Sequence, residues 1–217
     1  MSGYSRTPKL VKGGLALLDP LAGTVLRIVA LQYNPDTLTR TLQVRGVGND
    51  GGDRSEALRL KGPAVETYKL DAEIDATDVL ESGRGTAVML GLHPQIAALE
   101  ALVQPTSAAL RSADAVASTG SLEIAPAQAP LAVFVFGPQR IVPVRVTELG
   151  ITEEAFDTQL NPIRAKVSLS LRVLNVDDLG FDSRGGGLFM NYLQARERLA
   201  AQAGQGDFRT LGISGIH

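Results

Sequence analysis

Apolar and polar side chains alternate without interruption in residues 165–173, and they do so again in residues 68–75. Successive side chains of a β-strand point to opposite faces of the sheet, so this pattern predicts two strands that are each buried on one face only. Sheets that are solvated on one face are usually antiparallel. The chain is therefore predicted to be mainly β, with antiparallel pairing.

Further strands are predicted from shorter apolar runs. Residues 131–136 are continuously apolar and aromatic and stop at the turn dipeptide Gly137-Pro138, which is typical of a central strand. Weaker strand patterns lie at residues 10–18, 25–33, 38–44 and 141–149. Together these segments predict about seven strands, arranged as a β-barrel or a β-sandwich.

Helical spacing of apolar residues occurs twice. A short helix is predicted after Pro94, with Ile96, Leu99 and Val103 on one face, because proline suits the first turn of a helix. An amphipathic helix is predicted near the C-terminus, with an apolar stripe made of Phe189, Tyr192, Leu193, Leu199 and Ala200. Residues 185–187, three glycines, are interpreted as a hinge before it. We expect a β domain over residues 1–187, and a C-terminal helix and tail over residues 188–217.

Two long segments, residues 46–62 and 104–121, show neither the two-residue alternation of a strand nor the spacing of a helix. The first is rich in glycine and charge, and the second in alanine, serine and threonine. Loops this long are uncommon in compact domains and often carry function. We expect both to be mobile in the isolated chain and to become ordered against a partner.

Composition excludes several classes of partner. The chain has 21 Lys and Arg against 23 Asp and Glu, so its formal charge of −2 favours neither nucleic acid nor an anionic membrane. It contains no cysteine, which removes disulfides and thiolate metal sites. A signal peptide and an apolar run of about 18 residues are both missing, so we expect folding in the cytoplasm and no membrane insertion.

Candidate catalytic and metal-binding residues are few. His93 and His217 are the only histidines, and neither has ligand spacing. The candidate cation ligands form an acidic row, Asp71, Glu73, Asp75 and Asp78. The first three have a step of roughly 7 Å on one strand face, which favours a solvated ladder over a metal site. The glycine-rich residues 46–52 lack the Lys-Ser/Thr of a phosphate-binding loop. The sequence therefore predicts no catalytic residue, no cofactor and no metal, and a non-enzymatic role.

A series of motifs resembles one known family. In chain order they are LQYNPD at residues 31–36, GPAVETYKLDAEID at 62–75, HPQIAALE at 93–100, and a block that runs from FGP at 136–138 to NPIRA at 161–165. Their order and spacing, over most of residues 9–176, resemble the tube and baseplate-hub proteins, including tube initiators, of extracellular contractile injection systems. These proteins are related to the tail tube proteins of contractile phages.

The resemblance implies a structural subunit that forms a sixfold ring at the tube–baseplate junction. The implied partners are further copies of the chain, the spike protein, the adjacent tube or tube-initiator protein, and other baseplate subunits. Assembly would take place in the cytoplasm of the producing cell, as part of a phage tail-like particle that can be released. Tube initiator and hub adaptor remain alternative positions, as do phage and phage-derived particle. Some members carry a C-terminal peptidoglycan-binding module, which is not expected after the single helix that precedes His217.

Ring closure needs contacts between unlike surfaces of neighbouring copies. The candidate interface residues are charged or amide side chains of the long glycine-rich loop, two adjacent glutamates and two aromatic residues of the C-terminal helix: Asn49, Asp50, Asp53, Arg54, Arg59, Lys61, Glu153, Glu154, Phe189 and Tyr192. Two other functions stay open at this point. One is a β-barrel enzyme or small-ligand carrier, and the other is a cell-wall-binding baseplate component.

Overall fold

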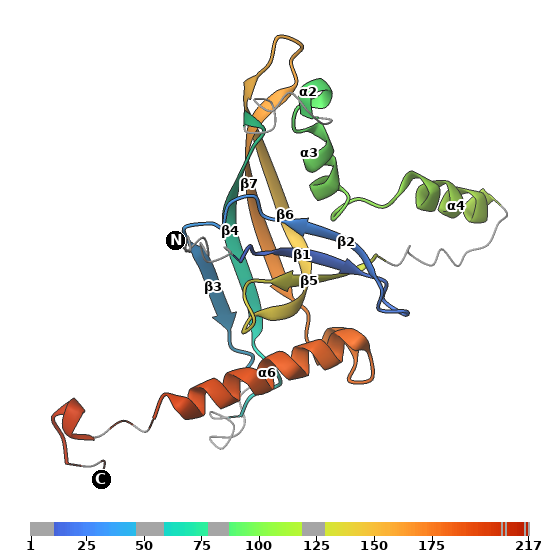
Figure 1. The fold of residues 1–217 in the computed structure, drawn as a ribbon. Helices are drawn as coiled ribbons and strands as arrows, with labels where there is room; N and C mark the ends of the chain where they lie inside the picture. Colours follow the sequence, from blue (N-terminus) through green and yellow to red (C-terminus); the bar gives the residue numbers. More distant parts are fainter. Residues whose placement is uncertain are drawn as a thin grey trace, which may run out of the picture.

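The computed structural model describes residues 11–46, 59–77, 87–118, 129–204, 206, 208–214 and 216. Over these ranges the chain forms one antiparallel sheet of seven strands in the order β2-β1-β5-β6-β7-β4-β3 (Figure 1). The strand bounds are Gly14–Leu18 (β1), Val25–Ala30 (β2), Leu38–Gln43 (β3), Val65–Asp75 (β4), Leu131–Val135 (β5), Ile141–Phe156 (β6) and Pro162–Val173 (β7). The predicted mainly β class is confirmed.

The alternation that predicted β4 and β7 matches their burial. In the β4–β7 pair Tyr68 lies opposite Leu171, and Leu70 lies opposite Leu169, with all four side chains buried. On the other face Glu73 lies opposite Lys166, and both are exposed. These two strands therefore separate a dry face from a charged face, as the period of two requires.

Strand β6 is longer than the predicted 141–149 because it serves two parts of the sheet. Its first residues pair with β5, and from Val144 onward it pairs with β7 as far as Phe156 opposite Pro162. The register shifts between Val146 and Glu148, which is a bulge, and bulges bend a strand. The last part of β6 is solvated on both faces, so it has no apolar alternation that could mark it in the sequence.

The sheet folds back on itself and remains open. Strands β1, β2 and β5 cross over β4 and β7 (Figure 1), and the main apolar core lies between the two groups, with Leu15, Leu31 and Phe134 packed into the same cluster as Leu70 and Leu171. A smaller cluster contains Leu18, Leu131 and Val133. Strands β2 and β3 are the two ends of the strand order and do not pair with each other. The described subunit is thus an open, rolled sheet and not a closed barrel.

The motif at residues 31–36 holds this roll together. The side-chain amide of Gln32 donates to the carbonyl of Asp75 at 2.7 Å and accepts from the Asp75 amide at 2.9 Å, which ties the segment after β2 to the end of β4. The Asn34 side chain accepts from the Gly13 amide and donates to the Val11 carbonyl. Both amides therefore act as structural links between segments that are distant in the sequence.

The helix after Pro94 is confirmed as α3, His93–Glu100, with Ile96 and Leu99 buried. Val103, predicted on the same face, lies beyond the end of the helix and is 44% exposed. The expectation of a loop at residues 104–121 was wrong for most of its length, because α4 occupies Ser107–Ser118. Alanine is the strongest helix former, and the five alanines of α4 favour a helix. The segment was not predicted as a helix because the helical spacing of its apolar residues is weak. The other helices are α2 (Ala87–Leu90), α5 (Val176–Leu179), α6 (Arg184–Gln202) and the 3-10 helix η2 (Phe208–Leu211).

The predicted glycine hinge is instead the start of α6. Ser183 caps the helix by accepting from the Gly186 amide at 2.9 Å. A Cβ on Gly186 would lie 1.9 Å from the Gly180 carbonyl oxygen, and one on Gly185 would lie 2.4 Å from a Leu179 methyl group. These glycines therefore allow close packing of α6 against the preceding turn, where a side chain would not fit. None of the described helices is long and apolar enough to cross a membrane.

Candidate assembly surface

The charged face of β4, β6 and β7 is an ordered set of ion pairs. Arg164 contacts Asp75 at 2.9 Å and Glu73 at 3.3 Å, and Lys166 contacts Glu154 at 2.8 Å. The bond to Glu154 raises the pKa of Lys166, and the bond to Asp75 raises the pKa of Arg164. Hydrogen bonds from Thr77, and then the bond from Arg164, lower the pKa of Asp75. Exposed pairs of this kind contribute only about 0–1 kcal/mol each to stability, so their arrangement bears more on recognition than on folding.

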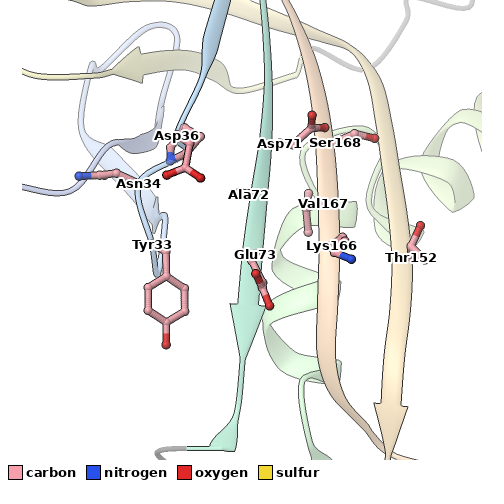
Figure 2. Close-up of a pocket in the computed structure, with 11 residues that line it drawn as sticks. Tyr33, Asn34, Asp36, Asp71, Ala72, Glu73, Thr152, Lys166, Val167 and Ser168 are labelled. Atoms are coloured by element: carbon pink, nitrogen blue, oxygen red, sulfur yellow. The ribbon is translucent and has the colours of Figure 1, made fainter.

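A hollow of about 600 Å³ lies over this face. Figure 2 shows Tyr33 and Asp36 on one side of it, Glu73 of β4 beside them, and Lys166 and Ser168 of β7 beyond. Side chains of both charge signs and hydroxyl groups surround it, so it can accept a partner surface that also carries both charges. Within the described ranges, no group of three or more His, Cys, Asp or Glu residues is placed to hold a metal ion.

Strand β2, at one free edge of the sheet, is mostly apolar, with Arg27 as its one charged residue. Val25, Leu26 and Ile28 are 58%, 55% and 69% exposed. A strand edge presents unpaired amides and carbonyls, and monomeric proteins usually protect such edges with charges, prolines or covering segments. An apolar unpaired edge is typical of a surface that another chain covers. The edge of β3 at the other end of the strand order carries Leu42, which is 48% exposed.

The β6–β7 hairpin ends in a rigid tip with apolar side chains. Leu160 has a positive φ of 64° and is 77% exposed, and Phe156 is 49% exposed. The Asp157 carboxylate accepts from the amides of Gln159 and Asn161 and from the Asn161 side chain, each at 2.8 Å. These bonds, led by that from the Asn161 side chain, lower the pKa of Asp157. The turn is therefore held in a conformation that a leucine seldom adopts.

The two aromatic residues predicted at an interface are buried inside the subunit. Phe189 and Tyr192 of α6 are 4% and 5% exposed and belong to the main core. The Tyr192 hydroxyl donates to Glu66 at 2.8 Å and accepts from Arg196 at 2.6 Å and from the Tyr68 hydroxyl at 2.9 Å. Their side chains pack against the subunit's own sheet, and their place at an interface stays a prediction.

Glu66 is the centre of a polar cluster that the sequence analysis missed. Arg40 of β3 and Tyr192 both donate to its Oε1 atom, and Arg196 lies 3.9 Å away. Burial is the largest cause of the raised pKa of Tyr68, followed by its hydrogen bonds to Tyr192 and Glu66. The sequence did indicate this cluster, because Glu66 lies two residues before Tyr68 and four before Leu70 and therefore on the same buried face of the strand. A buried carboxylate requires a partner.

The remaining predicted interface residues fall in two separate places. Arg59 and Lys61 are exposed just before β4, where the Lys61 amide donates to the Arg45 carbonyl. Glu153 and Glu154 lie near the β6–β7 tip, at the opposite end of the long strands, since Glu154 pairs with Arg164 and Arg164 with Asp75. The other four lie outside the described residues: Asn49, Asp50, Asp53 and Arg54.

Comparison with known proteins gave matches to solved structures only. No family model matches the sequence, and no curated protein matches it. One similar chain belongs to the tail of an empty gene transfer agent particle with C6 symmetry: it is 10% identical, with a TM-score of 0.29, over 75% of this chain and 90% of that chain. Another belongs to the virion of a native gene transfer agent particle, at 11% identity and a TM-score of 0.27, over 74% of this chain and 90% of that chain.

Proposed function

We propose that this chain is a structural subunit of a contractile injection system, and that copies of it close into a sixfold ring at the tube–baseplate junction. The ring joins the spike and hub to the inner tube. The ordered motifs that resemble tube and baseplate-hub proteins support this proposal. Two of those motifs have a clear structural role in the subunit. Residues 31–36 contain Gln32, which hydrogen-bonds to the end of β4, and residues 62–75 contain β4 itself.

The observation that carries the proposal is the open sheet with one charged face. A head-to-tail ring joins unlike surfaces of neighbouring copies, so each copy must expose two different surfaces. The free edges at the ends of the strand order, β2 and β3, are two such surfaces. In this proposal the charged face of β4, β6 and β7 lines the channel, and the strand edges meet the neighbouring copies by strand addition or by side-chain packing.

Averaged images of assembled particles test the proposal. We expect the chain in one layer between spike and tube, in six copies, and the layer itself distinguishes a tube initiator from a hub adaptor. A ring with another copy number, or a location outside the tube–baseplate region, contradicts the proposal. Monomers of the purified chain at low concentration are compatible with it, because ring closure depends on concentration and on bound partners.

A further inference from the structure

Helix α4 has an apolar face that the described subunit leaves uncovered. Residues three or four apart share a helix face, which places Ala109, Leu110, Ala113 and Ala117 on one side of α4, with Arg111 on the opposite side and Asp114 at the border beside Leu110. No residue of α4 is buried, and Leu110 is 58% exposed. Isolated helices of about 12 residues are marginal in water, so α4 needs a surface against which to pack.

An uncharged groove of about 240 Å³ lies elsewhere on the same subunit. It opens between the free edge of β2, helix α3 and the apolar face of β4 and β7, and its lining includes Ile28, Leu31, Ile74, Gln95, Ala98 and Leu99. All of its described lining residues are apolar apart from two glutamines. This composition matches a helix face made of leucine and alanine.

The groove lies on the outer side of the proposed ring. Ile74 and Leu169 line it, and in the strands they alternate with Glu73 and Ser168, which line the hollow on the charged face. Alternate residues point to opposite faces, so the groove and the charged hollow are on opposite sides of β4 and β7. If the charged face lines the channel, the groove faces outward.

The connection between α3 and α4 directs α4 away from its own groove. The turn after α3 continues to Gln104, whose amide donates to the Glu100 carbonyl at 3.1 Å. Thr106 begins the next ordered turn, because its side chain accepts from the Ala109 amide at 3.1 Å. Only Pro105 separates these turns, and proline also restricts the residue before it. In Figure 1 α4 accordingly extends sideways from the subunit.

We propose that α4 of one copy packs its apolar face into the groove of the neighbouring copy in the ring. The inference rests on the proposed ring, which supplies the neighbour. A helix in an apolar groove is a common recognition mode, and the small alanine side chains of α4 permit close approach while Leu110 enters the groove. An arm that leaves one copy sideways and covers the outer face of the next forms a head-to-tail contact that repeats around a closed ring.

Disulfide crosslinking tests this contact directly, because the natural chain has no cysteine. Ala113→Cys lies on the apolar face of α4, and Gln95→Cys lies in the groove. We expect that particles assembled from a coexpressed mixture of the two single variants give a disulfide-linked dimer of different chains after mild oxidation. The double variant is expected to give a ladder of linked chains on a non-reducing gel. Arg111→Cys, on the polar face, is the matched control for Ala113→Cys and should crosslink poorly with Gln95→Cys.

The outcomes separate this inference from the proposed function. Rings that form without these crosslinks overturn the α4 contact and leave the proposed ring intact. A link within a single chain of the double variant also overturns it, because α4 then folds back into its own groove. Particles that contain no ring of this chain overturn both.

A second pair of variants measures how much the contact contributes. We expect Leu110→Asp to weaken incorporation into particles by at least about tenfold, since a carboxylate cannot enter an uncharged groove. The melting temperature of the isolated chain should not change, because Leu110 is exposed there. Arg111→Asp on the polar face is the control and should incorporate normally. Equal incorporation of both variants contradicts the contact.

Discussion

The hydroxyl of Tyr192 donates a 2.8 Å hydrogen bond to Oε1 of Glu66, and both residues are buried. This bond joins the C-terminal helix α6 to β4 across 126 positions of sequence. The helix is therefore an integral part of the core around the sheet, since Phe189 packs in the same cluster as Tyr68 and Leu171.

Glu66→Ala is expected to destabilise the subunit by about 3–5 kcal/mol, because it leaves the Arg40 guanidinium partly buried without its carboxylate. The Nη2 atom of Arg40 already has no hydrogen-bond partner among the described atoms. Urea unfolding followed by circular dichroism measures the change. Glu73→Ala, at an exposed pair with Arg164, is the control and should cost about 1 kcal/mol or less. Similar losses in both variants would show that the Glu66 cluster adds no more than a surface pair.

Leu171→Lys and Ser170→Lys compare neighbouring positions on opposite faces of β7. Leu171 is fully buried, so an unpaired ammonium there should cost several kcal/mol and prevent stable folding. Ser170 lies on the charged face with its hydroxyl 3.3 Å from Glu148, so a lysine there gains a carboxylate neighbour. Soluble yield and melting temperature give the readout. Equal loss in both variants would mean that β7 is dry on both faces.

The stability of the subunit should fall in acid partly through Asp75. Its pKa is lowered in the folded state, so the carboxylate contributes stability that is complete above its unfolded pKa of about 3.9 and is lost as the pH falls through the folded value. We therefore expect a melting temperature that is nearly constant between about pH 7 and pH 5 and decreases below about pH 4. Asp75→Asn should show a smaller decrease over the acid range. An identical decrease would assign the acid sensitivity to other carboxylates.

Leu160→Asn should raise the melting temperature or leave it unchanged, although it removes an apolar side chain. Leu160 is largely exposed and has a positive φ, a conformation that asparagine adopts more readily. The gain should be at most about 1 kcal/mol, and differential scanning calorimetry can detect it. Thr158→Asn in the same turn is the matched control, with no expected gain. A clear decrease with Leu160→Asn would show that the leucine packs against the subunit in solution.

The alternation in residues 68–75 and 165–173 was enough to predict β4 and β7, their buried faces and the mainly β class. A two-residue period is a local property, and burial of one sheet face expresses it directly. The helix after Pro94 was predicted for the same reason, because its start and its apolar spacing are both local. The charged face with Glu73 and Lys166 also follows from the period alone, although the pairing partner of each charge does not.

The openness of the sheet, its two free edges and the polar cluster around Glu66 depend on contacts between distant segments. The Gln32–Asp75 link spans 43 positions and the Glu66–Tyr192 bond spans 126, and no local pattern contains both partners of either contact. Strand order is likewise a global result of how the apolar faces of β1, β5 and β7 meet in one core. Phe189 and Tyr192 were predicted at an interface, and helical spacing places both in an apolar stripe. The spacing cannot distinguish a stripe that a neighbouring subunit covers from one that packs on the chain's own sheet, because both remove the same apolar area from water.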